Sequence, residues 1–246
     1  MLVLLSILGL AQAESPNFNK HTAQTLSGGQ WSVGVFAPLR YGLKEDLELE
    51  IHPLWALMAP HIAVKKAYST KGKLQLASRH QLGYPTLFLS NVLARGGIGG
   101  VLAPDSIIPP TLVSQNDLYF GGETTYGELT SSVGASLAIE LGESNYTTID
   151  APYGFRATNL YQNTLSVQLG AGWEYFLTDT IGFRFWSKAW FYPLAEQKWA
   201  LEEKDTLLIQ ISEKSQAALG VNFILADYPY GVQWHALPSF DWVWTF

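Results

Sequence analysis

Residues 165–175 read LSVQLGAGWEY, a stretch in which apolar residues alternate with small or polar ones. Successive side chains of a β-strand point to opposite faces, so this pattern predicts a strand with one apolar face and one small or polar face. The same alternation recurs in residues 47–51, 217–225 and 240–246. The chain is therefore predicted to be an all-β protein built from many such strands.

The composition of the two faces indicates which of them is enclosed. In a soluble β-sandwich the apolar faces form the core and the outer faces carry charge. Here the second face is dominated by Gly, Ser, Gln and Ala, and Trp and Tyr lie near the ends of the apolar faces. This arrangement is typical of a membrane barrel, which turns apolar side chains toward lipid and leaves no unpaired backbone edge in hydrocarbon. We expect a single antiparallel transmembrane β-barrel.

Connection lengths support this interpretation. Short turns are predicted at residues 42–46, 69–72, 121–122, 178–180 and 212–214, and they alternate with longer connections, of which 93–110 is the longest. Short periplasmic turns and longer external loops are a feature of outer-membrane barrels. The predicted strands are 20–26, 30–41, 47–57, 60–68, 73–90, 111–120, 124–142, 158–177, 181–194, 198–211, 215–228 and 231–246, which makes 12. Glu203 and Asp205 would face lipid, unless this stretch lies above the membrane or a bulge resets the alternation.

The composition excludes several classes of function. The chain has 246 residues and no cysteine, which excludes disulfide scaffolds, iron–sulfur clusters and thiol catalysis. Its net charge of -6 argues against binding nucleic acid, which requires a basic face. Only 15% of its residues are charged, against about 25% in soluble domains.

The first residues predict export. Residues 2–10 are almost entirely apolar, and Ala11-Gln12-Ala13 follows them as an A-x-A cleavage pattern. This combination predicts a signal peptide over residues 1–13 and a barrel domain over residues 14–246. No later apolar run reaches the ~18 residues that a membrane helix needs.

The last residues resemble the C-terminal assembly signal of Gram-negative outer-membrane β-barrel proteins. Phe240, Trp242, Trp244 and the terminal Phe246 stand at every second position. Residues 41–49 also look like the first inner turn of many small barrels of this class. The resemblance implies a location in the outer membrane among phospholipid and lipopolysaccharide. It also implies periplasmic chaperones and the barrel-assembly machinery as partners during biogenesis. It carries over no functional residue and leaves the oligomeric state open.

Assigning the apolar face to lipid assigns the other face to the lumen. The charged or ionisable residues predicted to line the lumen are Glu48, Glu50, His52, Lys65, Arg79, Glu140, Glu174, Arg184, Lys188, His235 and Asp241. A turn centred on Asp179 places Glu174 opposite Arg184, and we expect this pair to form. Both signs of charge are present, so neither anions nor cations are favoured. These residues are interpreted as polar lining or a salt network, with a selective substrate path as the alternative.

The sequence favours a passive pore for small polar solutes, narrowed by the loop at residues 93–110. One alternative is a rim enzyme acting on lipid or lipopolysaccharide, with His80 or His52 as its base; another is a non-conducting structural barrel. No catalytic motif is present, and no cofactor is expected. His52, His61 and Glu50 could hold a metal ion, but polar lining is the preferred interpretation and no metal is expected.

Overall fold

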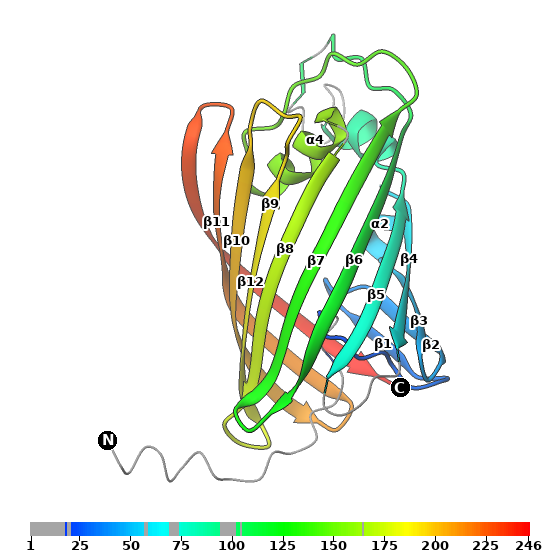
Figure 1. The fold of residues 1–246 in the computed structure, drawn as a ribbon, viewed down its shortest axis with the longest axis vertical. Helices are drawn as coiled ribbons and strands as arrows, with labels where there is room; N and C mark the ends of the chain where they lie inside the picture. Colours follow the sequence, from blue (N-terminus) through cyan, green and yellow to red (C-terminus); the bar gives the residue numbers. More distant parts are fainter. Residues whose placement is uncertain are drawn as a thin grey trace.

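The computed structural model describes residue 18 and residues 21–56, 59–68, 74–93, 102–103, 105–163 and 165–246. Twelve antiparallel strands close into one barrel (Figure 1). The strands are β1 (Trp31–Gly34), β2 (Leu39–Lys44), β3 (Leu47–Ile51), β4 (His61–Tyr68), β5 (Gln75–Gly83), β6 (Thr111–Thr124), β7 (Gly127–Glu140), β8 (Leu165–Phe176), β9 (Ile181–Phe191), β10 (Trp199–Ser212), β11 (Ser215–Tyr228) and β12 (Gly231–Thr245). The predicted all-β fold, a single barrel of about 12 strands, is confirmed.

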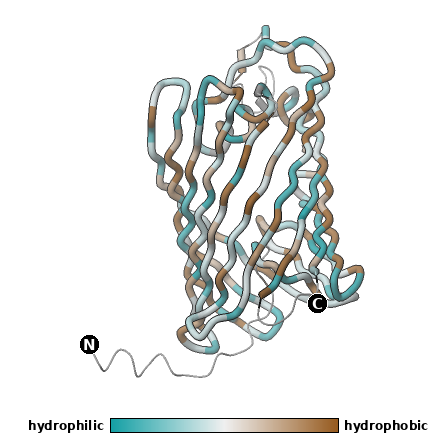
Figure 2. The backbone as a smooth tube through the Cα atoms, viewed as in Figure 1, coloured by the Kyte–Doolittle hydropathy of each residue, from teal (hydrophilic) through white to brown (hydrophobic). Residues whose placement is uncertain are grey.

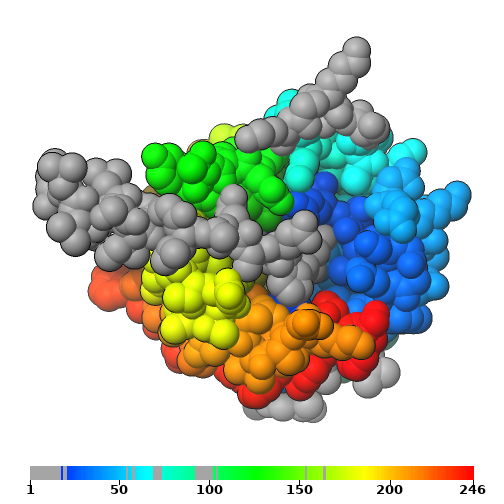
Figure 3. Space-filling view, turned by 90° about the horizontal axis from the view of Figure 1, so that it is seen from below, coloured from blue at the N-terminus to red at the C-terminus, as the bar shows by residue number. Residues whose placement is uncertain are grey.

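The strands follow one another around the ring in chain order, and β1 pairs with β12 to close it. The end of the barrel that carries the β6–β7, β8–β9 and β10–β11 turns and the C-terminus is called the lower end (Figure 1). Seen from this end, the chain runs around the ring from blue to red, so that its first and last strands are neighbours (Figure 3).

Short helical segments lie at the opposite, upper end. They are α2 (Pro53–Ala56), α3 (Thr86–Phe88), the π-helical turn η1 (Leu89–Leu93) and α4 (Pro152–Asn163). The ribbon places α4 within the mouth of the barrel, across the inside of the wall (Figure 1). Among the described residues, no helix has the length and apolar character needed to cross a membrane.

The predicted orientation of the two faces is confirmed. On β8 the side chain of Val167 is 39% exposed, whereas its neighbours Ser166 and Gln168 are buried. On β11 Leu219 is 45% exposed and Asn222 is buried. Alternating hydrophilic and hydrophobic segments can be seen along strands at the front of the barrel in Figure 2. Large apolar side chains therefore face outward and polar ones face the lumen.

The wall is uneven in height. Strands β1 to β5 have between 4 and 9 residues, whereas β6 to β12 have between 11 and 15. The shortest strands, β1 to β3, lie on one side of the barrel and stop below its upper end (Figure 1), whereas β4 and β5 reach the level of Val113, near the start of β6. At the point where the ring closes, β1 pairs with only the last residues of β12, so the upper part of β12 has no described strand on that side.

The first predicted strand, residues 20–26, is wrong. The described residues 21–30 form no strand but pass through the lower lumen, where Thr22, Ala23 and Leu26 are buried. The next predicted strand, 30–41, is divided into β1 and β2 by a bend at residues 35–38 that ends on Pro38. The predicted number of strands, twelve, nevertheless agrees with the structure, because the strand predicted at 20–26 is absent and the one predicted at 30–41 forms two.

Three other predicted strands were drawn too long because helical turns were missed. The predicted strands 47–57, 73–90 and 158–177 include parts of α2, of α3 with η1, and of α4 respectively. Prolines mark each helical start: Pro53 and Pro152 are the first residues of α2 and α4, and Pro85 caps α3. Proline suits the first helical position because its fixed φ matches the helix and its missing N–H costs no hydrogen bond there.

One predicted turn was misplaced. Gly121 and Gly122 lie inside β6, and the reversal occurs at Thr125 and Tyr126. The following residue, Gly127, has a φ of 109°, a conformation that L-residues with a side chain rarely adopt. The other described turns fall where they were predicted, and residues 69–72 lie outside the described residues.

The acidic stretch of β10 keeps strict alternation. The pairing of β10 with β9 and β11 runs without a shift from Ala200 to Ile209, so no bulge resets the faces there. Glu202 and Lys204 consequently face the lumen, and Glu203 and Asp205 face outward. Of the two explanations open from sequence, the bulge is excluded.

Candidate functional site

The lower lumen contains a buried ion pair that sequence reasoning only half identified. Arg40 on β2 forms two hydrogen bonds with Glu48 on β3, from Nε to Oε1 at 2.7 Å and from Nη2 to Oε2 at 2.8 Å. Both side chains are almost fully buried. The backbone N–H of Leu26 also donates to Glu48, at 2.8 Å. Glu48 thus ties the incoming N-terminal segment to the wall.

A second group of charges continues this layer, which we call the floor. Arg79 on β5 bonds to Glu50 on β3 at 2.8 Å and lies 4.0 Å from Asp117 on β6. Asp117 also lies 3.3 Å from Lys188 on β9. The ammonium of Lys65 is fully buried and lies 5.6 Å from the centre of the Tyr119 ring. Charges from five strands therefore meet across the lumen, and Arg79, Glu50, Asp117 and Lys188 form contacts of opposite sign.

The predicted pair of Glu174 and Arg184 is confirmed. The two residues are directly opposite in the β8–β9 register, and Nε of Arg184 lies 2.6 Å from Oε2 of Glu174. Glu128 of β7 is opposite Glu174 on the other side. A local register read from one turn was sufficient to place this contact.

The N-terminal segment fills part of the lower lumen with an aromatic contact. The ring of His21 stacks on Trp186 with centroids 4.8 Å apart. Trp186 lies flat against β8, where a Cβ added at Gly172 would come within 2.2 Å of its ring. Gly172 is therefore needed at this position because any side chain would displace Trp186.

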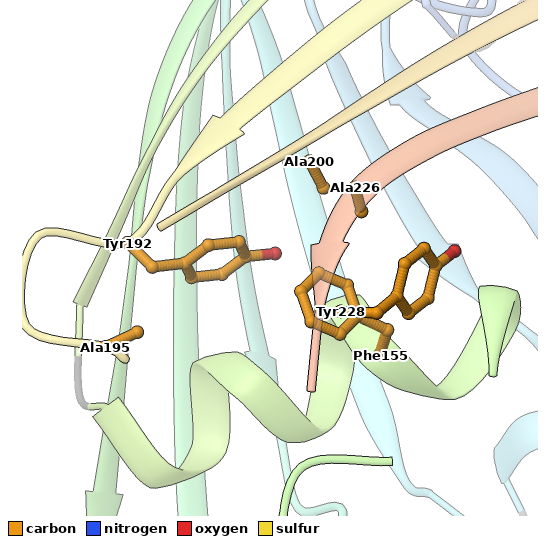
Figure 4. Packing of buried hydrophobic residues seen from close by; sticks show 6 residues of the cluster. All are labelled: Phe155, Tyr192, Ala195, Ala200, Ala226 and Tyr228. Carbon is orange, nitrogen blue, oxygen red and sulfur yellow. The ribbon is translucent and has the colours of Figure 1, made fainter. Parts of the chain in front are cut away.

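The upper lumen is closed by apolar packing around α4, which we call the roof. Phe155 of α4 packs against Tyr192, Tyr228 and the small residues Ala195, Ala200 and Ala226 (Figure 4). The rings of Phe155 and Tyr228 lie 4.7 Å apart. Residues 155, 158 and 159 are all buried, which is the spacing of one helical face. The roof is thus a small hydrophobic core built inside the mouth of the barrel.

Two polar contacts orient the roof. Arg156 forms an ion pair with Glu202 of β10, and its guanidinium lies 4.5 Å from the centre of the Trp190 ring. Tyr146 donates a hydrogen bond to Glu140 at 3.0 Å. Burial and the nearby Glu140 carboxylate raise the pKa of Tyr146, so this phenol stays protonated and remains a donor.

A chamber of about 910 Å³ lies between the floor and the roof. Its upper surface includes Leu89, Ile149 and Tyr161, and its lower surface includes Arg40 and Trp186. Burial raises the pKa of Tyr161 to about 12, so that it faces the chamber as a neutral phenol. The chamber is lined mainly by apolar atoms, although the charged side chains of Arg40, Arg184, Lys204 and Asp241 also line it. Ligand sites commonly combine these properties.

The chamber reaches the side of the barrel along one edge of β12. The backbone carbonyls of Phe246 and Trp242 on β12 accept hydrogen bonds from the N–H groups of Trp31 and Val35. The backbone N–H and C=O groups of the even-numbered residues of β12 therefore point toward the β1 side. In the described chain, no strand pairs with this edge above Trp242. Pro238 is even-numbered, so an N–H at this position would point to the side on which no described strand pairs. Proline therefore costs no hydrogen bond of the sheet there.

Side chains from both faces of β12 line the chamber near this edge. Ser239 and Asp241 face the lumen, whereas Pro238 and Phe240 belong to the outward face, yet all four line the same space. The chamber must therefore extend around the edge of the strand. Asp241 accepts a hydrogen bond from the N–H of Phe36 at 3.0 Å, which holds the β1–β2 bend below this side opening.

The remaining predicted lining residues are His52, which follows β3, and His235 on β12. Nε2 of His52 lies 2.7 Å from the carbonyl oxygen of Phe36, and the ring of His235 meets Tyr228 edge-on at 5.2 Å. The rings of His52 and His61 are 6.4 Å apart, and Glu50 is engaged with Arg79 instead. Within the described ranges, no three ionisable side chains are grouped as a metal site would require. Residues 94–101 and 104 of the 93–110 loop lie outside the described residues.

Sequence reasoning missed Arg40, Asp117, Arg156 and Glu202. The alternation could have placed Asp117 and Glu202 in the lumen once β6 and β10 were assigned. The alternation of the predicted strand 30–41 could likewise have placed Arg40 in the lumen, because Ser32 and Arg40 share one face. Arg156 was missed because α4 was read as a loop and strand. His80, a candidate base, lies on the outer face of β5 and not in the lumen.

No family model matches the chain, and no curated protein sequence is significantly similar to it. The site is therefore defined by its own geometry: a largely apolar chamber, closed below by paired charges and above by a helix, and open toward the side of the wall.

Proposed function

We propose that this protein is a Gram-negative outer-membrane barrel that takes a small, largely apolar or amphiphilic molecule into its chamber through the side opening. The outward-facing apolar side chains of β7, β8, β11 and β12 support the membrane location. The outward Glu203 and Asp205 are opposite the outward Phe223 and Val221 of β11, so they would lie within the apolar layer. The terminal Phe246 would serve assembly by the barrel-assembly machinery.

The observation that carries this proposal is the shape and lining of the chamber. A volume of about 910 Å³ is within the range of small-molecule sites, and its lining is mainly apolar. Its extension around the free edge of β12 gives a path from the surrounding lipid that avoids both the floor and the roof. Polar groups at its lower side, including Arg40 and Asp241, would orient a polar headgroup.

The hypothesis of a passive pore for polar solutes stays a prediction. An aqueous path along the barrel axis would have to pass the buried Arg40–Glu48 pair at the floor and the Phe155 cluster at the roof. Both are closely packed, which favours a binding chamber over an open channel.

Binding of a fluorescent fatty acid to the protein in lipid nanodiscs tests the proposal. Ala218 lines the chamber, so Ala218→Trp should fill it and weaken binding about tenfold or more, equivalent to ~1.4 kcal/mol. Ala135→Trp adds the same side chain to the outer face of β7 and should leave binding unchanged.

Planar-bilayer recording of the same preparations separates the two functions. We expect no stepwise conductance from the wild-type protein. Stable conductance together with no binding of the fatty acid would reject the chamber and favour the pore.

A further inference from the structure

The outer face of the barrel holds a second arrangement of reactive groups. Ser78 and His80 stand two residues apart on β5, and His80 is directly opposite Asn116 of β6. Ala77 and Asp117, their neighbours, are buried in the lumen, so the three side chains face outward. His80 and Asn116 are exposed there, among the outward apolar residues Leu82, Leu112 and Phe120.

The three side chains are joined in a fixed order. Nδ1 of His80 lies 2.7 Å from Oδ1 of Asn116, and Nε2 of His80 lies 3.2 Å from Oγ of Ser78. Nδ2 of Asn116 donates to Ser114 at 3.2 Å, which turns Oδ1 toward the histidine. An amide oxygen only accepts, so Nδ1 carries the proton and Nε2 is left as an acceptor facing the serine hydroxyl. This is the tautomer that a general base needs.

We propose that Ser78, His80 and Asn116 form a hydrolytic triad on the outer face of the barrel, acting on acyl esters of membrane lipids. Ser78 is the nucleophile and His80 the base, both catalytic residues, and Asn116 is a positioning residue. A nucleophile bonded to a base that is itself oriented by a third group defines this class of site on unrelated folds. The substrate class follows from the location, because an outward-facing site amid apolar side chains meets lipid.

The chemistry balances with water as the only co-reactant. Oγ of Ser78 attacks the ester carbonyl carbon while its proton passes to Nε2 of His80. The bond to the alcohol breaks, and His80 returns the proton to the leaving alkoxide. Water then attacks the acyl-serine and gives a proton to His80, and the fatty acid leaves as Ser78 regains its hydrogen.

A phenol lies beside the reacting oxygen, and the ammonium of Lys66 lies 5.7 Å from the centre of that phenol's ring. The hydroxyl of Tyr68 lies 2.8 Å from Oγ of Ser78, and Lys66 is directly opposite Ser78 in the β4–β5 register. A phenol and an ammonium can both stabilise the oxyanion that forms during acyl transfer. Ser78 is only 7% exposed, so the substrate reaches it when the Tyr68 side chain, which is 41% exposed, turns aside.

Labelling with a fluorophosphonate, which reacts with activated serines, tests the triad in folded protein in detergent micelles. We expect one label on the wild type, its loss in Ser78→Ala and His80→Ala, and a marked reduction in Asn116→Ala. Ser131→Ala is the matched control, because Ser131 is also an outward serine but has Phe120 and Ala171 opposite it. Slower migration of each heated sample in gels would show that every variant contains a folded barrel.

Hydrolysis assays identify the ester. Release of fatty acid from phosphatidylethanolamine, or from purified lipid A, would support the triad and name its source. His80→Ala should lower the rate by about 10²–10⁴-fold. Asn116→Ala should lower kcat more than it raises KM, which a purely structural role would not do. No labelling and no release by the folded wild type, or undiminished labelling of Ser78→Ala, would overturn the proposal. The triad is on the opposite side of the wall from the chamber, so either can fail alone.

Discussion

The floor and the roof of the lumen close the same barrel by different physical means. The floor consists of buried charged side chains from β2, β3, β4, β5, β6 and β9, most of which form ion pairs. The roof consists of aromatic and small apolar side chains gathered around α4. Removing one partner of an ion pair in the floor leaves a buried charge without its counter-charge, which is strongly destabilising. Removing an apolar side chain from the roof instead leaves a cavity, and its cost depends on how far the neighbours can fill it.

The difference also explains where the chamber lies. Paired charges need strands on both sides to supply partners, so they occur at the lower end, where all twelve strands are present. The roof is built above the level at which β1 to β3 end, and there the helix α4 packs inside the tall part of the wall. The chamber occupies the junction between the two, next to the unpaired edge of β12.

The largest effect is expected from breaking the floor. Arg40→Ala leaves the buried Glu48 carboxylate without its counter-charge and should reduce the free energy of unfolding by about 3–5 kcal/mol. Denaturant unfolding in lipid vesicles, followed by tryptophan fluorescence, measures this change. The double variant Arg40→Ala with Glu48→Ala should lose less than the sum of the two single variants. Strict additivity would mean that the pair contributes no coupling.

A somewhat smaller effect is expected from the roof. Phe155→Ala removes the central ring of the cluster and should cost about 3 kcal/mol, because the helix can move to fill part of the space. The same unfolding assay applies, and protease digestion should show earlier cleavage within residues 141–164. Val232→Ala, at an exposed outward position, serves as the control and should change neither result. Equal protease resistance in the two variants would contradict the proposed packing.

The ion pair of the roof is more exposed than the Arg40–Glu48 pair of the floor, so its loss should cost less free energy of unfolding. Arg156 and Glu202 retain 22% and 15% exposure of their side chains, so solvent screens them more than Arg40 and Glu48. Arg156→Met, which keeps most of the stem, should therefore cost only about 1 kcal/mol. A loss as large as that of Arg40→Ala would show that burial does not separate the two pairs.

The smallest effect is expected at the wall itself. Glu174→Gln keeps the shape of the side chain and weakens its bond with Arg184, at a cost of about 0.2–1 kcal/mol. Added salt should narrow the difference between variant and wild type, because the pair is partly exposed. A salt-independent difference would point to packing rather than charge.

Several features of the site could be predicted because they depend on neighbours along the chain. Alternation assigned Glu48, Lys65 and Arg184 to the lumen, and the turn at Asp179 fixed the Glu174–Arg184 register. The partners of Glu50 and Lys188 could not be predicted, because Arg79 and Asp117 meet them from strands that are not their neighbours in the sheet. The structure of residues 21–30 and of α4 was predicted wrongly because both segments enter the lumen. Such segments have no period-two pattern that would indicate where they lie.

The order of residues along the chain is enough to specify which side chains of the wall face outward and which face inward, because a period of two with one apolar face assigns each residue of a strand to one side. What the wall encloses, and where it is incomplete, depends on the three-dimensional arrangement of the strands. The joining of Ser78, His80 and Asn116, the free edge beside Pro238, and the meeting of floor and roof all depend on how strands of unequal length pair around a closed ring. That pairing is a global property, because closing the ring fixes every register at once, whereas alternation is decided residue by residue.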